Sequence, residues 1–239
     1  MARKTIRSIP QERAFMPVLD AEERAKNFEE VSLGFDEANA SVECERCLIC
    51  PEPACIPGCP VEIDIPGFIT KMLKKDYHGA WDTLTDSTFL PAVCGRVCPQ
   101  EVQCEEQCSV GIRFKPVAIG YLERFVADWE MTQPARDVSV KLDRAEKVAI
   151  IGSGPAGLVC AGELARLGYP VTIFEALHAP GGVLRYGVVA YRCDLDFLGQ
   201  ELADVKALGV EFKCNTPIEG PAAAEALLDQ GYHAVFLGP

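Results

Sequence analysis

RCLICPEPACIPGCPVEIDIPGFI, residues 46–69, is the stretch that decides the fold of the N-terminal part of this chain. Its cysteines follow the spacing Cys-x2-Cys-x4-Cys-x3-Cys-Pro, from Cys47 to Pro60. In iron–sulfur proteins with a run of this kind, three thiolates hold one cluster and the cysteine before proline reaches another. The stretch therefore predicts two clusters that take further ligands from elsewhere in the chain.

A second stretch, residues 90–108 (LPAVCGRVCPQEVQCEEQC), can supply those ligands and also places one cysteine directly before proline. Nine of the 12 cysteines lie in or beside the two stretches: Cys44, Cys47, Cys50, Cys55, Cys59, Cys94, Cys98, Cys104 and Cys108. Together the two runs predict an electron relay.

Zinc is the first alternative, because Cys-x2-Cys begins many structural zinc sites of four ligands. However, a second pair at this spacing is missing from the sequence, and the two Cys-Pro dipeptides favour iron–sulfur ligands. A disulfide framework is a weaker alternative. The N-terminus lacks the pattern of a secretory leader, so we expect a cytoplasmic protein whose thiols stay reduced.

Composition excludes several other classes of function. The formal net charge is −12, and neither half of the sequence has an excess of basic residues, so we expect no nucleic-acid partner. The longest apolar runs, such as residues 148–151, are far shorter than the roughly 20 residues that span a bilayer. We therefore expect no membrane span.

Residues 1–143 are predicted to form an all-α domain. Apolar periodicity and cap residues, including Asp20 as an N-cap, predict helices over residues 20–31, 36–46, 66–75, 77–84 and 116–130. Residues 134–144 are charged and lack periodicity, which is typical of a linker between domains.

Residues 144–239 begin with the pattern of a βαβ unit. Strands are predicted over residues 147–151 and 171–174, with the turn GSGPAG (residues 152–157) and a helix to residue 167 between them. Gly152 permits the tight turn, Gly154 lets the backbone approach a pyrophosphate, and Gly157 allows close helix–strand contact. The pattern predicts a dinucleotide site; an ordinary strand-to-helix turn is the alternative.

Glu175 ends the second predicted strand, 23 residues after Gly152. An acid at this position can accept a hydrogen bond from a ribose hydroxyl. It also disfavours a 2′-phosphate, so FAD or NAD is a better expectation than NADP.

These motifs resemble the small subunit of NADPH-dependent glutamate synthase and its relatives. The relatives include the large subunit of NADH-dependent ferredoxin:NADP oxidoreductase and the N-terminal half of dihydropyrimidine dehydrogenase. Besides the cysteine and glycine motifs, residues 116–129 (PVAIGYLERFVADW) and 180–187 (PGGVLRYG) carry the similarity. It implies an all-α, α-helical ferredoxin-like domain with two [4Fe-4S] clusters, followed by part of a Rossmann-like FAD-binding α/β domain.

The resemblance also implies the ligands of both clusters. One cluster takes Cys47, Cys50, Cys55 and Cys108, and the other takes Cys59, Cys98, Cys104 and Glu123. By spacing alone, Glu123 would be an exposed acid on a helix face. Cys44 and Cys94 match no ligand position and are expected to have a structural or supporting role.

For the flavin, the resemblance implies a site lined by Gly152, Gly154, Pro155, Ala156, Gly157, Glu175, Gly182, Leu184 and Arg185. The alternative for Arg185 is a surface cation. Relatives carry proline after the segment that matches Tyr186 and Gly187, whereas this chain reads YGVVAYRCD over residues 186–194. We therefore expect the backbone near the flavin to differ.

Residues 232–239 (YHAVFLGP) predict a strand, after which relatives continue into an NAD(P)-binding domain and the rest of the flavin fold. We expect the NAD(P)H site outside these residues, either in a longer protein or in the partner of a shortened subunit.

The resemblance implies an electron-transfer subunit of an NAD(P)H-dependent oxidoreductase, with no catalytic side chain in this chain. Its partners would be other oxidoreductase subunits, of the glutamate synthase large-subunit, ferredoxin-linked or hydrogenase type, in a hetero-oligomer. A flavin-based electron-bifurcating enzyme and a non-catalytic iron–sulfur relay or scaffold subunit are the alternatives.

Overall fold

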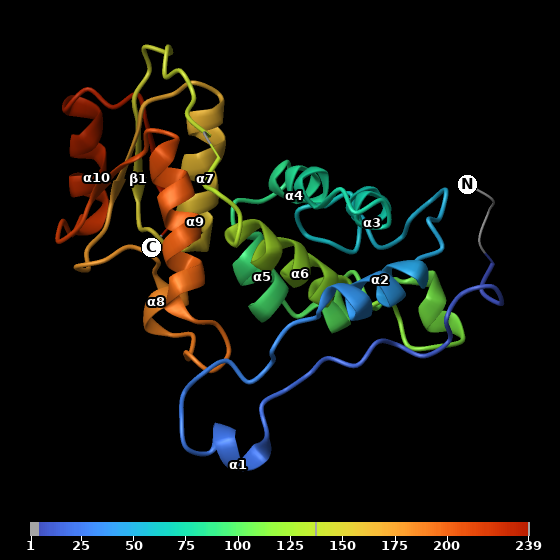
Figure 1. The fold of residues 1–239 in the computed structure, drawn as a ribbon. Coiled ribbons are helices and arrows are strands. Elements are labelled where there is room, and N and C mark those ends of the chain that lie inside the picture. The colour runs from blue at the N-terminus through green and yellow to red at the C-terminus, as the bar shows by residue number, and fades with distance from the viewer. Residues whose placement is uncertain (1–4, 137, 239) are drawn as a thin grey trace. The chain divides into compact units, whose positions relative to one another are not determined.

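The computed structural model describes residues 5–136 and 138–238, which form two compact units (Figure 1). The first unit holds the described residues up to Pro134 together with Ala190–Asp194. The second holds Ala135–Val189 and the residues from Leu195 onward. A helical unit and an α/β unit confirm the predicted fold class. The boundary expected between residues 143 and 144 stays a prediction; the division in the structure falls after residue 134.

The helices of the first unit are α1 (Ala21–Arg24), α2 (Glu37–Glu45), α3 (Ile65–Met72), α4 (Tyr77–Thr85), α5 (Pro91–Val97) and α6 (Ile119–Met131), with 3-10 turns η1 (Gln100–Val102) and η2 (Ser109–Ile112). The second unit contains β1 (Val148–Ile151), α7 (Pro155–Arg166), β2 (Val171–Phe174), α8 (Val183–Tyr186), α9 (Leu195–Ala207), β3 (Glu211–Lys213), α10 (Gly220–Asp229) and β4 (Ala234–Leu237).

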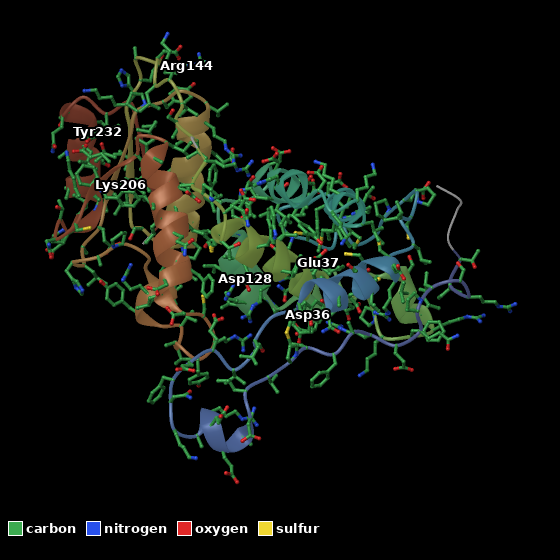
Figure 2. All side chains as sticks on the ribbon, viewed as in Figure 1. Asp36, Glu37, Asp128, Arg144, Lys206 and Tyr232 are labelled. Carbon is green, nitrogen blue, oxygen red and sulfur yellow. The ribbon has the colours of Figure 1, made fainter. Side chains whose placement is uncertain are left out.

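Aspartate caps start three helices of the first unit. The side chains of Asp36, Asp64 and Asp76 each accept a hydrogen bond from the backbone amide three residues later, at 2.7, 3.0 and 3.0 Å. Asp36, labelled in Figure 2, starts the helix that leads into the first cysteine run. These caps satisfy amides that the helix itself leaves unpaired. Local sequence signals therefore set where α2, α3 and α4 begin.

The helix expected over residues 20–31 is wrong beyond Arg24, where α1 ends. Its predicted cap is present, since Asp20 accepts a hydrogen bond from the Glu22 amide at 2.8 Å. Further along, the amide of Val31 donates to the carbonyl of Tyr191 at 3.0 Å, and its carbonyl accepts from Leu19 at 2.8 Å. This pairing with distant segments uses the backbone groups that a helix would need.

Helices α5 and α6 come into backbone contact at Gly95. A Cβ atom there would lie 2.6 Å from the backbone nitrogen of Arg124, so only glycine permits this approach. Beside the contact, Arg96 pairs with Glu30 and Asp128 at 2.7 Å each, and Arg124 pairs with the same two acids. Asp128 is labelled in Figure 2. This buried ionic network fixes the two helices against each other.

The second unit is a parallel four-stranded sheet in the order β3-β2-β1-β4. Figure 1 shows α10 on one face of the sheet and α7 with α9 on the other. Ala149 and Phe174 form a core cluster with Leu227 of α10. The next residue along β1, Ile150, contacts the opposite side, near Gly157 of α7. The central strands β1 and β2 therefore have two buried faces, as expected of a doubly wound fold, whereas β3 and β4 are more exposed.

Candidate functional sites

Four thiols surround one cavity in the first unit. Cys47, Cys50 and Cys55 reach it from the loop after α2, and Cys108 reaches it from the start of η2. The rest of its lining is largely apolar, with Ile69 of α3 among the residues behind the sulfurs. The two cysteine runs thus meet at this cavity, and the structure brings together the four residues predicted for the first cluster.

Burial and mutual repulsion disfavour ionisation of these thiols in the absence of a cation. Burial, followed by repulsion from the Cys47 and Cys108 thiolates, raises the pKa of Cys55 to about 12. Several buried thiolates can ionise together only when a positive charge lies among them. The donor set therefore fits a soft, cationic iron core.

A second cavity draws its donors from three parts of the first unit. Cys59 comes from the first run, Cys98 and Cys104 come from the second run, and Glu123 comes from α6. Burial, then the charges of Glu123 and Cys59, raise the pKa of Cys98 to about 11. The same kinds of interaction raise the pKa of Cys104, again with burial as the largest cause. The second predicted ligand set is thus also gathered at one place.

Glu123 is a buried acid whose position indicates a ligand. Its side chain is 5% exposed, and its Oε1 atom has no hydrogen-bond partner among the described residues. Burial raises the pKa of Glu123 to about 8. Leaving a buried carboxylate oxygen unpaired costs free energy unless a cation binds there. The donors at the second cavity therefore also fit a cluster, and the exposed acid expected from spacing alone is wrong.

Neighbouring cysteines serve different cavities. Cys55 and Cys59 are four residues apart, yet the first lines one cavity and the second lines the other. Across residues 5–136 and 138–238, no three histidine, cysteine, aspartate or glutamate side chains converge as ligands of a single ion. The thiols instead surround two separate spaces. The assignment of individual ligands stays a prediction.

A buried ion pair stands directly before the first ligand. Arg46 and Glu43 pair at 2.6 Å with both side chains fully buried. The Arg46 guanidinium also donates to the carbonyl oxygens of Pro10 at 3.2 Å and Pro116 at 3.0 Å, and Glu43 accepts from the amide of Ala118 at 2.7 Å. The pair joins the N-terminal segment, the end of α2 and the segment before α6. We call it the Glu43–Arg46 clamp; sequence reasoning missed it.

In the second unit, the glycine turn follows β1 and leads into α7. Gly152 has a φ of +95°, which favours glycine, and a Cβ atom at Gly157 would overlap the carbonyl oxygen of Gly152. At Gly154, by contrast, a Cβ atom would meet nothing within 4 Å. The space beside Gly154 is therefore open at the N-terminus of α7, where a phosphate is favoured. Pro155 and Ala156 form the first turn of this helix.

Glu175 holds the glycine turn in place. Its carboxylate accepts hydrogen bonds from the hydroxyl and the amide of Ser153, the latter at 3.0 Å, and from the amide of Leu177 at 2.8 Å. Burial alone would raise the pKa of Glu175, but the hydrogen bonds from Ser153 and Leu177 lower it below its usual value. The backbone of Ala176 also donates to Glu175, so these contacts use about as many acceptor sites as a carboxylate has. Contact of Glu175 with a ribose stays a prediction.

Ser153 is a second residue that sequence reasoning missed. It is fully buried, and its Oγ atom accepts from the amide of Gly181 at 3.0 Å while donating to Glu175. A small polar residue between two glycines was the only available signal. Ser153 ties the loop after β2 to the glycine turn.

The remaining predicted flavin residues lie on the loop that leads into α8. Gly182 has a φ of +52°, and a Cβ atom there would lie 2.7 Å from the Cα atom of Gly154. Leu184 is buried. The Nε atom of Arg185 donates to the carbonyl of Pro180 at 2.6 Å, so this side chain supports its own loop. Gly182 is thus brought to the glycine turn, whereas contact of Arg185 with a ligand stays a prediction.

Two family models match the chain. Residues 24–135 match "Dihydropyrimidine dehydrogenase domain II, 4Fe-4S cluster", and residues 150–199 match "NAD(P)-binding Rossmann-like domain". The fold and sites therefore define a class of proteins in which an iron–sulfur domain precedes a Rossmann-like nucleotide-binding domain.

Two curated relatives show which proteins of this class the chain is similar to. It is 38% identical over 209 residues to the NAD-dependent dihydropyrimidine dehydrogenase subunit PreT homolog of Salmonella typhi, covering 87% of this chain and 50% of that protein. It is 34% identical over 239 residues to the glutamate synthase [NADPH] small chain of Escherichia coli (strain K12), covering all of this chain and 50% of that protein. The chain is similar to these oxidoreductase subunits, as the resemblance implies, and spans about half the length of the curated relatives it matches.

Proposed function

We propose that the chain is the electron-transfer part of an NAD(P)H-dependent oxidoreductase similar to the glutamate synthase small chain. Electrons would move between FAD and two [4Fe-4S] clusters and then to a partner subunit. When bound, the flavin exchanges electron pairs with a nicotinamide and the clusters carry single electrons. The observation that carries this proposal is the pair of cavities, each lined by the four predicted ligands of one cluster and each combining both cysteine runs.

The residues of this chain bind and orient the cofactors. Thiols and Glu123 supply the ligands, and the apolar lining of the cavities excludes water, which together with ligand type adjusts the reduction potential. In the second unit, the glycine turn and the N-terminus of α7 offer amides to a pyrophosphate. No side chain is needed as an acid, base or nucleophile.

The sequence identities to the relatives favour a second candidate for the subunit that receives the electrons. The dihydropyrimidine dehydrogenase subunit is 38% identical to the chain, against 34% for the glutamate synthase small chain. A subunit that passes electrons to a dihydropyrimidine dehydrogenase is therefore the second proposal. The ligand cavities support both, because they concern the cofactors and not the final acceptor.

The location and assembly of the protein are also proposals. The 12 cysteines, all of them within the described residues, form no disulfide, and groups of reduced thiols persist in a reducing compartment, so we place the protein in the cytoplasm. Because the relatives are named as subunits, we also propose a hetero-oligomer. Among the residues described, no helix has the length and apolar character to cross a bilayer.

Quantifying metal, sulfide and flavin after anaerobic purification tests the proposed function. We expect about eight irons, about eight sulfides and one FAD per chain. One zinc per chain in place of iron would contradict the proposal. Eight irons without flavin would instead support the relay subunit.

Two glycine substitutions separate nucleotide binding from folding. Gly154→Ala adds a methyl group only to open space, so we expect it to lower the free energy of unfolding by less than about 1 kcal/mol, the scale of a helix-cap change. The same methyl group would occupy the space of a pyrophosphate, so FAD per chain should fall strongly. Gly157→Ala should cost about 1–3 kcal/mol or more through overpacking against Gly152.

Flavin absorbance and far-UV circular dichroism check both variants. Full FAD occupancy in a folded Gly154→Ala protein would remove the glycine turn from the flavin site, whereas the iron content of both variants should stay at the wild-type value.

A further inference from the structure

The second cavity has one donor more than a cluster needs. A [4Fe-4S] cluster takes four protein ligands, one for each iron. The first cavity is lined by four cysteines, but the second is lined by Cys59, Cys94, Cys98 and Cys104 together with Glu123. Neither the resemblance nor the spacing of the runs gives Cys94 a ligand role.

Cys94 lies one helical turn before Cys98, which is a predicted ligand at this cavity. Cys94 lies in α5, and the amide of Cys98 donates to its carbonyl at 3.1 Å, which is one helical turn. Residues four apart on a helix share one face. The side-chain amide of Gln100 also donates to the Cys94 carbonyl at 2.7 Å and holds the end of the helix. Cys94 and Cys98 therefore face the same cavity.

Cys94 and Glu123 come from two helices that meet beside this cavity. Helices α5 and α6 approach each other where Gly95 meets the backbone of Arg124. Cys94 immediately precedes Gly95, and Glu123 immediately precedes Arg124. Glu123 is buried, lines the cavity and has an Oε1 atom without a partner among the described residues. Cys94 and Glu123 therefore line the same cavity from two packed helices.

We propose that Cys94 is an alternative ligand to Glu123 for one iron of the second cluster. In the exchange, Glu123 releases the iron while the sulfur of Cys94 binds it, and the proton of the thiol passes to the freed carboxylate. No electron is gained or lost. Thiolate is a softer donor than carboxylate, so the two forms differ in reduction potential. The inference rests on the proposed function, because it requires the second cluster.

Three variants test the exchange: Glu123→Ala, Cys94→Ser and the double variant. We expect each single variant to keep about eight irons per chain, because one of the two donors remains. Glu123→Ala should show a changed EPR signal and midpoint potential for one cluster. The double variant should lose about four irons, while the signal of the other cluster reports that the unit is still folded.

The matched control combines Glu123→Ala with Cys44→Ser. Cys44 is buried, and its Sγ atom lies 3.7 Å from the Sδ atom of Met72. It is not one of the described residues that line the two cavities. This double variant should keep about eight irons.

Three results would overturn the exchange: loss of a cluster in Glu123→Ala alone, loss of one in Cys94→Ser alone, or no further loss in their combination. A wild-type protein with far fewer than eight irons would instead defeat the proposed function itself, so the two failures are distinguishable.

Discussion

A Cys59→Ser variant should lose about four of its roughly eight irons per chain and the EPR signal of one cluster, while the signal of the other persists. The reason is the position of Cys59, which belongs to the first run in sequence but lines the cavity of the second run. A serine hydroxyl is a harder and far less acidic donor than a thiol, so it replaces the ligand poorly. Iron analysis and EPR of reduced protein provide the measurement.

Two other cysteines give this experiment its controls. Cys55 lies four residues away in the same loop but lines the first cavity. The Cys55→Ser variant should therefore lose the EPR signal of the other cluster. Cys44→Ser should keep both signals. We expect no rescue of Cys59→Ser by Cys94, because the proposed exchange concerns the iron that Glu123 binds and not the iron that Cys59 binds. If Cys59→Ser and Cys55→Ser removed the same signal, the division of ligands between two cavities would be wrong.

Arg46→Met should lower the free energy of unfolding by about 3–5 kcal/mol, a large part of the roughly 5–15 kcal/mol of a typical domain. The substitution leaves the fully buried Glu43 carboxylate without its cation and removes hydrogen bonds to the carbonyls of Pro10 and Pro116. Removing one partner of a buried pair is more damaging than its net contribution suggests, because the other charge stays desolvated. The midpoint of urea unfolding, followed by circular dichroism under anaerobic conditions, gives the measurement.

Lys75→Met is the matched control for the Glu43–Arg46 clamp. It removes the cation of an ion pair with Glu37 at 2.7 Å, where the two side chains are 71% and 54% exposed. Water and salt screen such a pair, so its loss should shift the urea midpoint far less than Arg46→Met does. An equal shift for the two variants would mean that burial does not distinguish the clamp from a surface pair.

The parts of the fold that depend on local signals could be predicted from the sequence. Aspartate caps indicate where α2, α3 and α4 begin, and the glycine turn between two apolar strands indicates the βαβ unit. The helix after Asp20 could not be delimited, because distant segments compete for the backbone of Val31. Likewise α9, β3 and α10, which have weaker local signals, became evident only in the structure.

The sites show the same limit. Cysteine spacing indicates two clusters and separates Cys59 from the other three thiols of its run, but the complete ligand set of each cluster came from the resemblance. Burial of Glu123 could not be inferred from its residue type, since glutamate is usually exposed. Cys94 and Glu123 line one cavity because α5 packs against α6 at Gly95, and no local sequence pattern indicates a contact between two helices.

The sharing of both cavities between the two cysteine runs has a consequence for biosynthesis. With the proposed ligands, neither site would be complete until a ribosome has released the chain beyond residue 108, and the second would also need residue 123. Cluster insertion would then follow synthesis of almost the whole helical unit, and a nascent chain that ends after the first run would lack a complete site.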